Sequence, residues 1–208
     1  MFVDGYALSL DFANSAEWRS PGDDQERLRN YEAVLNWARE ETILDEAQVQ
    51  NLLDRARREP EGAGEALVRI VGLREAVYRI FASAAHGRGS EPADLDLLNG
   101  ELAEAMRHLR LSPLGADEEG GNSYAWMWVD IESQLTSMLW PVARSAALLL
   151  TSPQLPRLRD CANESCGWLF IDHSKNASRR WCDMGECGNR AKARRFRERK
   201  RSEPVRGS

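Results

Sequence analysis

The sequence predicts a mainly α protein of the α+β class, in which a helical N-terminal domain precedes a small C-terminal module. Apolar residues recur at helical spacing through most of the first 150 residues, two short stretches alternate at strand spacing, and all four cysteines lie beyond residue 160. A chain of 208 residues is long enough for one core of moderate size and a small module. We therefore expect two domains, at residues 1–152 and 153–208.

The N-terminal segment has the residue pattern of a β-strand. Apolar side chains alternate with polar or small ones over residues 6–13, which predicts a strand with Leu8, Leu10 and Phe12 facing inward. Polar groups beside an aromatic ring at its end could form the lip of a small-molecule pocket, a role that we assign to Asp11, Asn14, Trp18 and Arg19. The structural alternative, in which these residues cap a turn and form a salt bridge, agrees better with the usual role of Asp and Asn in loops.

Helical patterns follow this segment. Apolar stripes predict four helices, which begin near Asp24, Asp45, Glu65 and Pro92. The charged stretch over residues 57–64 contains proline and glycine and predicts a turn. A further helix is predicted over residues 130–150. We expect this last helix to kink at Pro141, because proline removes one backbone donor.

The spacing of apolar residues changes from helical to alternating between residues 107 and 130. Residues 108–114 and 123–129 alternate on either side of an acidic, glycine-rich stretch, which predicts a β-hairpin. Trp126 and Trp128 are two residues apart and so share one face of a strand. That face could stack on a base or ligand, but packing against the helices is the more common role of such aromatics and is the interpretation that we favour.

The four cysteines form two pairs with the spacing C-x4-C-x15-C-x4-C, namely Cys161, Cys166, Cys182 and Cys187. Two loop-mounted thiolate pairs at this separation can surround one tetrahedral Zn²⁺, so we expect one closed structural zinc site. Disulfides are the alternative, which the missing secretory signal and the long cysteine-free region disfavour. A predicted hairpin of residues 167–171 with 178–181, followed by a helix over residues 191–201, gives the element order of a treble-clef finger.

The charge is divided between the two ends of the chain. Residues 1–156 carry 14 basic and 26 acidic side chains, whereas residues 157–208 carry 14 basic and 7 acidic ones. A basic module beside an acidic domain is typical of a protein that binds a polyanion at one end. The alternative is a basic tail that stays solvated or docks on its own acidic domain.

A nucleic-acid interface would draw on the hairpin and the last helix of this module. The basic side chains that we assign to it are Arg179, Arg180, Arg190, Lys192, Arg194, Arg195, Arg197 and Arg199. Ala193 and Phe196 mark the side of the helix that we expect to pack on the hairpin. Arg190 lies so close to Cys187 that a structural bond is an equally good interpretation of it.

Several stretches resemble a known family. The run Cys187–Arg190 reads CGNR and, with the two C-x4-C pairs, resembles the CGNR zinc finger. Residues 8–19 and 139–146 resemble the opening and the closing helix of the ABATE domain that usually precedes this finger, although residues 13 and 15–17 depart mildly from its pattern. The resemblance covers nearly the whole chain. It implies a bacterial, stress-induced transcription regulator whose N-terminal domain acts as a sensor of a ligand or partner, or in oligomerisation.

These observations leave two classes of function. No apolar run is long enough for a membrane span and no secretory signal is visible, so we expect a cytoplasmic protein without membrane contact. No catalytic dyad and no phosphate-binding glycine loop stands out, so we expect no enzyme.

The first class is a zinc-dependent binder of nucleic acid, with duplex DNA preferred over RNA and a homodimer suited to paired half-sites. The second class is a finger that serves as a structural or protein-interaction module.

Overall fold

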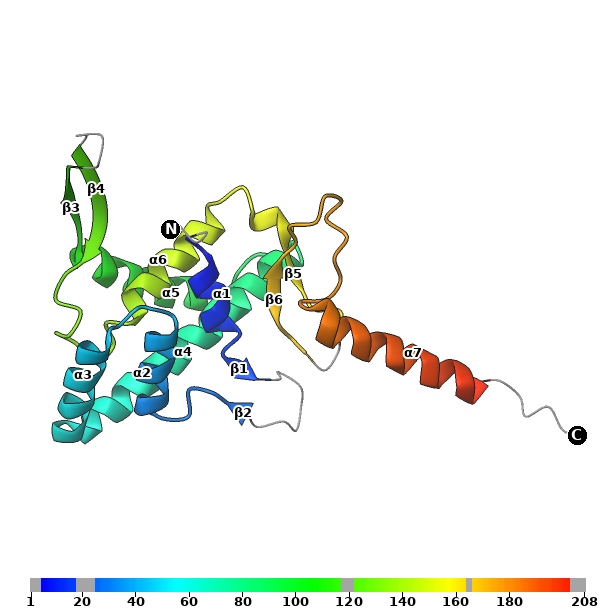
Figure 1. The fold of residues 1–208 in the computed structure, drawn as a ribbon, viewed down its shortest axis with the longest axis horizontal. Helices are drawn as coiled ribbons and strands as arrows, with labels where there is room; N and C mark the ends of the chain where they lie inside the picture. Colours follow the sequence, from blue (N-terminus) through cyan, green and yellow to red (C-terminus); the bar gives the residue numbers. More distant parts are fainter. Residues whose placement is uncertain (1–4, 18–24, 117–121, 164–165, 203–208) are drawn as a thin grey trace, which may run out of the picture.

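The structure is a computed structural model, which describes residues 5–17, 25–116, 122–163 and 166–202. We call residues 5–154 the body and residues 155–202 the finger (Figure 1). The body contains α1 (Ala7–Ala13), β1 (Ala16–Glu17), β2 (Gln25–Glu26), α2 (Tyr31–Glu40), α3 (Glu46–Arg58), α4 (Pro60–Ala85), α5 (Pro92–Arg107), β3 (Leu109–Ala116), β4 (Asn122–Trp128) and α6 (Leu139–Leu150). The finger contains η1 (Leu155–Arg157), β5 (Leu158–Asp160), β6 (Leu169–Ile171), η2 (Met184–Gly188) and α7 (Asn189–Ser202).

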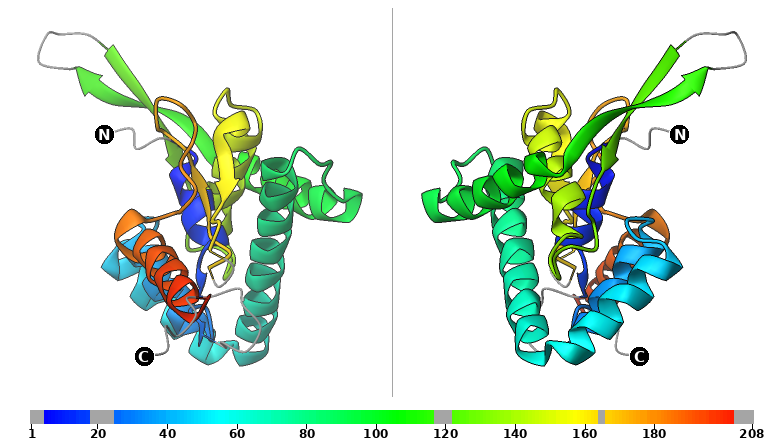
Figure 2. Two further views of the ribbon diagram at one scale, coloured as in Figure 1. Left: turned by 90° about the vertical axis from the view of Figure 1, so that its right-hand side faces the viewer. Right: turned by 90° about the vertical axis from the view of Figure 1, so that its left-hand side faces the viewer.

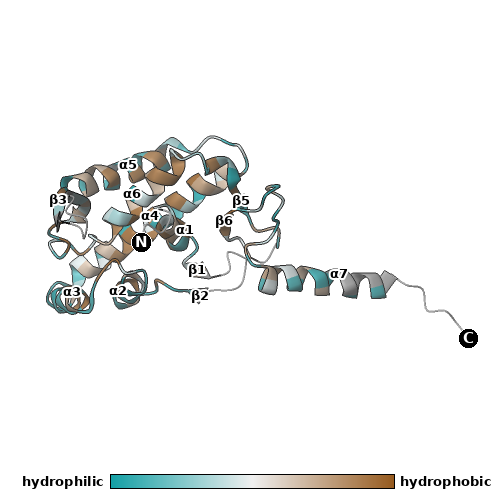
Figure 3. Ribbon diagram, turned by 45° about the horizontal axis from the view of Figure 1, so that its top comes forward, coloured by the Kyte–Doolittle hydropathy of each residue, from teal (hydrophilic) through white to brown (hydrophobic). Residues whose placement is uncertain are grey.

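The long helix α4 is the centre of the body, and α1, α2, α3 and α5 pack against it (Figure 2). Its fully buried side chains include Ile70, Leu73, Val77, Ile80 and Phe81. Apolar residues are prominent in α4, α5 and α6 (Figure 3), and α1, α2 and α3 also contribute buried side chains to the same core. Among the described residues, no helix is both long and apolar enough to cross a membrane.

The start of α4 corrects one prediction. The sequence predicted a turn over residues 57–64, but α3 continues to Arg58 and α4 begins at Pro60. Proline is well tolerated at the first helical position, because the amide hydrogen that it lacks has no partner within the helix there. A proline and two glycines therefore did not interrupt the helical region for more than one residue.

The first element is a helix, so the predicted strand over residues 6–13 is wrong. Ser9, Leu10, Phe12 and Ala13 of α1 are buried, and α1 packs on α4 and α6. The backbone N–H of Ser9 donates to the hydroxyl of Ser145 on α6 at 3.0 Å. A helix satisfies its own backbone groups, which a lone strand buried between helices does not, and this requirement overrides the alternating pattern.

The last helix of the body starts later than the sequence predicted. Residues 130–138 form turns, and α6 begins at Leu139. Pro141 therefore lies in the first turn, where an amide has no helical acceptor, and the reason for the predicted kink is absent. The fully buried ring of Trp140 stacks on His108, with 3.8 Å between the ring centroids.

The predicted hairpin of the body is confirmed. Strands β3 and β4 pair antiparallel, with Leu109 opposite Trp128 and Leu111 opposite Trp126, and the hairpin projects away from the helices (Figure 2). Trp128 packs at its base, with its ring centroid 6.4 Å from that of Trp140. Trp126 lies further out and is 55% exposed. The packing interpretation therefore holds for Trp128 and is wrong for Trp126.

The strands of the finger correct another prediction. Strand β6 pairs antiparallel with β5, which precedes the first cysteine, rather than with residues 178–181. Leu158, Leu169 and Ile171 on these strands belong to the same buried apolar cluster as α4 and α6. The pairing is therefore set by burial against the body. The helix predicted after the cysteines is confirmed as α7.

Candidate metal centre and nucleic-acid interface

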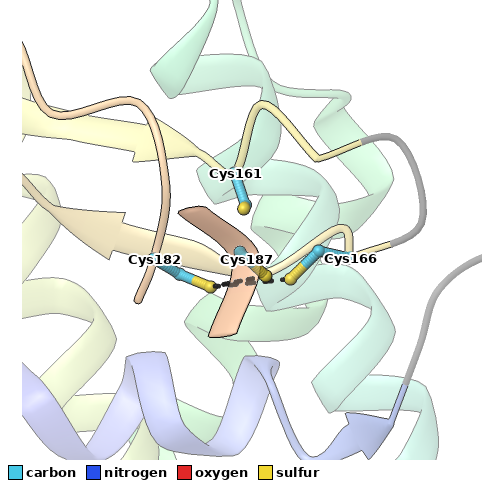
Figure 4. A group of neighbouring side chains, drawn as sticks. All are labelled: Cys161, Cys166, Cys182 and Cys187. Carbon is cyan, nitrogen blue, oxygen red and sulfur yellow. Dashed lines mark hydrogen bonds between the residues drawn. The ribbon is translucent and has the colours of Figure 1, made fainter. Parts of the chain in front are cut away.

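The four cysteine sulfurs lie within 4.8 Å of one another and converge on a common space (Figure 4). The Cys166 and Cys182 sulfurs are 3.6 Å apart, and those of Cys182 and Cys187 are 3.7 Å apart. Four sulfurs at about 2.3 Å from a central zinc ion lie about 3.8 Å apart in a tetrahedron. The donor set and its spacing therefore fit one structural zinc ion, as predicted.

Backbone hydrogen bonds hold the first cysteine pair in place. The amide of Cys161 donates to the carbonyl of Trp168 at 2.8 Å, and that of Cys166 donates to the carbonyl of Asn163 at 2.8 Å. Gly167 has a φ of 68°, a left-handed conformation that glycine adopts without strain. These bonds turn the chain sharply after β5, so that both sulfurs face inward.

The second pair is positioned by the short π-helical turn η2. The Asp183 carboxylate accepts a hydrogen bond from the Glu186 amide at 2.7 Å, which begins the turn. A Cβ at Gly188 would lie 3.2 Å from the sulfur of Met184, closer than ordinary packing allows. The Asn189 side-chain amide donates to the Gly185 carbonyl at 2.7 Å. Glycine and asparagine of the CGNR run therefore shape the backbone that presents Cys187 at the start of α7.

Asn163 is a functional residue that the sequence reasoning missed. Its buried side-chain amide lies 3.5 Å from the sulfur of Cys187 as a hydrogen-bond donor. Such a donor stabilises negative charge on a metal-bound thiolate and fixes its orientation. An asparagine two residues after a cysteine carries no signal of this role by itself, because its partner is 24 residues away.

The thiols compete for protons when no metal is bound. A hydrogen bond from Cys182 is the main cause that lowers the pKa of Cys166 to about 5. Burial raises the pKa of Cys187 to about 11, and the hydrogen bond with Cys166 raises the pKa of Cys182. Cys166 thus ionises readily, whereas a cation at the centre of the cluster is needed to ionise Cys182 and Cys187. Zinc binding therefore releases protons.

Arg179 and Arg180, which the sequence had placed on a hairpin, have different surroundings. Arg179 is partly buried: its guanidinium donates to the carbonyls of Trp181 and Cys182 and lies over the Phe170 ring at 5.0 Å from its centroid. Its main contacts are therefore within the finger. Arg180 is exposed and lies over the Trp181 ring at 5.7 Å from the centroid.

The basic residues of α7 occupy an extended helix. It leaves the finger and points away from the body (Figure 1). The side chains of Arg190, Lys192, Arg194 and Arg197 are exposed, whereas the side chains of Arg195, Phe196 and Arg199 lie outside the described residues. Ala193 is exposed, so the expectation that it packs on the hairpin is wrong. The helix is anchored at its N-terminal end, through η2.

The predicted pocket residues are only partly brought together. Asp11 and Asn14 both line a cavity of about 280 Å³ between α1 and the finger, whereas Trp18 and Arg19 lie outside the described residues. Asp11 also lines a second cavity, within the body. Asn14 is buried, and its side chain bonds Leu169 twice: its amide donates to the Leu169 carbonyl and its oxygen accepts from the Leu169 amide, both at 2.9 Å.

Further bonds join the body to the finger next to this contact. The Tyr78 hydroxyl on α4 donates to the Gly167 carbonyl at 2.9 Å. His86, at the end of α4, lies 3.4 Å from the Asp160 carboxylate on β5. Asn14, the C-cap residue of α1, thus contacts the finger, and Asp11 of α1 lines the cavity in the body. The division into residues 1–152 and 153–208 stays a prediction, since β5 and β6 share the core of the body.

The fold and the four-thiol site define a zinc-finger protein with a helical N-terminal domain. Residues 6–153 match ABATE, described as "Putative stress-induced transcription regulator", and residues 157–200 match the CGNR zinc finger. The ABATE match covers more than half of the chain, so the protein belongs to this family. The resemblance seen in the sequence is confirmed for both parts. No curated protein matches the sequence.

Proposed function

We propose that the protein is a zinc-dependent, DNA-binding transcription regulator, in which the finger contacts duplex DNA and the body senses a small-molecule ligand. The observation that carries the proposal is the exposed set of basic side chains on α7, a helix that extends away from the acidic body (Figure 1). Arg190, Arg194 and Arg197 are three or four residues apart and therefore share one face of the helix.

Zinc would be held by Cys161, Cys166, Cys182 and Cys187. When bound, it supplies a rigid cross-link between the two cysteine turns. Because Cys187 lies directly before α7, this cross-link fixes the first turn of the helix. The arginines then meet phosphates or guanine edges with less loss of conformational freedom than on an unanchored tail.

The body has a direct route for influencing the finger. The bonds of Asn14 to Leu169 and of Tyr78 to Gly167 connect the C-terminal end of α1 and the C-terminal half of α4 to the segment that follows the first cysteine pair. A ligand that shifts α1 would therefore change how the finger is held. A homodimer, which would match a site with two half-sites, is part of the proposal.

One observation favours a second candidate, a finger that acts as a structural or protein-interaction module. Strands β5 and β6 complete the apolar core of the body through Leu158, Leu169 and Ile171. A finger with only this role would not need an exposed basic helix, and it would show little affinity for nucleic acid. RNA binding is a variant of the first proposal, because basic side chains on a helix attract both polymers.

The test is fluorescence anisotropy of labelled random duplex DNA, duplex RNA and single strands, titrated with the zinc-loaded protein across a salt series. Duplex DNA should bind most tightly, and the logarithm of affinity should fall by about 0.9 per phosphate contact for each tenfold rise in salt. A variant in which Arg190, Arg194 and Arg197 are replaced by Ala should lower the salt slope by about 2.7, which is about 0.9 for each of three phosphate contacts.

The matched control replaces three exposed arginines of the body, Arg29, Arg58 and Arg88, by Ala. It removes the same net charge and should leave the salt slope unchanged. Equal weakening by both triple variants would mean that total charge, not α7, determines binding. No binding at low salt would favour the structural module, and tighter binding to RNA would change the proposed partner.

A further inference from the structure

The body contains a cavity of about 370 Å³ that is separate from the zinc site. It lies between α1, the C-terminal end of α2, the base of β4 and the first half of α6. Its volume is at the small end of the range for ligand sites, about 300–1,000 Å³, and suits a metabolite of amino-acid size. Three carboxylates, a guanidinium and an indole ring line it, from Asp11, Glu40, Glu41, Arg144 and Trp128. The Glu40 carboxylate pairs with Arg27 at 3.7 Å.

The acidic side of the cavity favours a cation. Asp11 on α1 and Glu41 at the C-cap of α2 are close enough for their charges to repel. Burial, followed by this repulsion, raises the pKa of Glu41, and burial raises the pKa of Asp11. The cavity also faces the C-terminal end of α2, where the helix dipole is negative. A protonated amine placed between the carboxylates would relieve their repulsion.

Arg144 on α6 provides the opposite charge. Among the described residues it forms no ion pair, although Asp11 and Glu41 line the same cavity. Arg144 and these carboxylates are therefore held apart rather than neutralising each other. An ion pair would require a guanidinium nitrogen within about 4 Å of a carboxylate oxygen. The separation leaves room for a ligand that carries both charges.

The remaining walls are apolar. The indole of Trp128 and the side chains of Leu8 and Pro141 line the cavity between its charged groups. These surfaces suit a short aliphatic chain, and the indole face also attracts a cation. Ser145 contributes less, because its hydroxyl already accepts the backbone N–H of Ser9.

We propose that this cavity binds a small amino acid with a second cationic group, whose carboxylate faces Arg144 and whose side-chain cation faces Asp11 and Glu41. The ligand has two positive charges and one negative charge, which match Asp11, Glu41 and Arg144, whereas Glu40 already pairs with Arg27. The inference rests on the proposed role of the body as a ligand sensor, and it names the chemical class of that ligand.

The test is isothermal titration calorimetry of the full-length, zinc-loaded protein with three probes. L-Lysine carries all three charges, L-norleucine lacks the side-chain ammonium, and cadaverine lacks the carboxylate. Lysine should bind at least about tenfold more tightly than either of the others, a difference of about 1.4 kcal/mol. Equal binding of lysine and norleucine, or no heat with any probe at about 10 mM, would overturn the proposal.

Variants assign each charge to its partner. Asp11→Asn should abolish the preference for lysine over norleucine, and Arg144→Gln should abolish the preference for lysine over cadaverine. Glu41→Gln repeats the first test in case Asp11→Asn does not fold, and far-UV circular dichroism checks each variant. Glu32→Gln, on an exposed position of α2 away from the cavity, is the control and should bind as the wild type does. Unchanged preferences in both cavity variants would contradict the assignment.

Failure here is distinguishable from failure of the proposed function. Lysine binding without any effect on DNA affinity would support the cavity and contradict a sensor role. DNA binding by α7 without binding of any probe would support the finger and contradict the cavity ligand.

Discussion

The body and the finger are held together by different forces. The body buries an apolar stripe on α4, against which α1, α2, α3 and α5 pack. Outside the strands that it shares with the body, the finger has a buried cluster made almost entirely of cysteines, with Trp181 partly buried beside them. The body should therefore fold by hydrophobic burial alone, whereas the finger depends on thiolates that require a metal.

This difference explains how a small module can carry an exposed helix. An isolated helix of 14 residues is marginal in water, because its nucleation is costly. Helix α7 lies beyond the body and begins at a cysteine turn, so the metal centre supplies its anchor (Figure 1). The body, in return, supplies the apolar surface that β5 and β6 need. The finger thus depends on two supports, the zinc ion and the body.

The largest effect should follow from removing a thiolate. Cys187→Ser should reduce the bound zinc from one equivalent to almost none, because structural zinc sites contribute about 10–16 kcal/mol. Zinc content by mass spectrometry and helicity by circular dichroism measure the two regions separately. The body should remain helical. Loss of the helical signal of the body in this variant would contradict the comparison, and His173→Ala, an exposed residue between the pairs, serves as the control.

A smaller effect should follow from truncating a buried side chain in the core of the body. Phe81 is fully buried on α4, so Phe81→Ala should lower the free energy of unfolding by about 3–5 kcal/mol. Urea denaturation followed by tryptophan fluorescence measures the change. Zinc should stay bound until the body unfolds. Leu97→Ala, at a position that is 41% exposed on α5, should cost much less and controls for helix propensity.

Breaking the contact between the body and the finger should lower the free energy of unfolding by a somewhat smaller amount. Asn14→Ala leaves the buried N–H and C=O of Leu169 without partners, which should cost about 2–3 kcal/mol. Hydrogen exchange of the Leu169 amide should become faster, while zinc content stays at one equivalent. Asn51→Ala removes an exposed hydrogen bond to Glu132 and should have little effect. Unchanged exchange at Leu169 would mean that the two regions are not coupled at this contact.

The smallest effect should be confined to binding. Arg180 is exposed over the Trp181 ring, so Arg180→Ala should leave the unfolding midpoint unchanged. The salt slope of DNA binding should fall by about 0.9, the value for one phosphate contact. Arg88→Ala on the body is the matched control. A slope that does not change would remove Arg180 from the interface.

The sequence predicted those features that depend on local patterns. The cysteine spacing predicted the metal centre, and the stripes of α4 and α5 predicted most of the body. Residues 7–13 were misjudged because seven residues with several small side chains are compatible with either period. The partner of β6 was misjudged because burial against the body, not the next segment of the chain, determines it.

In the candidate sites, too, the sequence did not predict which distant residues come together. Asp11 was predicted as a pocket residue, but its companions Glu41, Trp128 and Arg144 are distant in sequence and carry no shared motif. The bond of Asn14 to Leu169 spans 155 positions, so only the fold brings the two together. Long-range contacts of this kind depend on how the helices pack, and no local pattern encodes them.

The most direct test of the account is DNA binding before and after zinc removal. The full-length protein is titrated into labelled duplex DNA as the zinc-loaded form, after chelation, and after zinc is restored, with circular dichroism recorded on each sample. We expect chelation to abolish salt-dependent binding while most of the helicity remains, and restored zinc to recover it. Unchanged binding by the zinc-free protein would contradict the claim that the metal-held finger is the DNA-binding region.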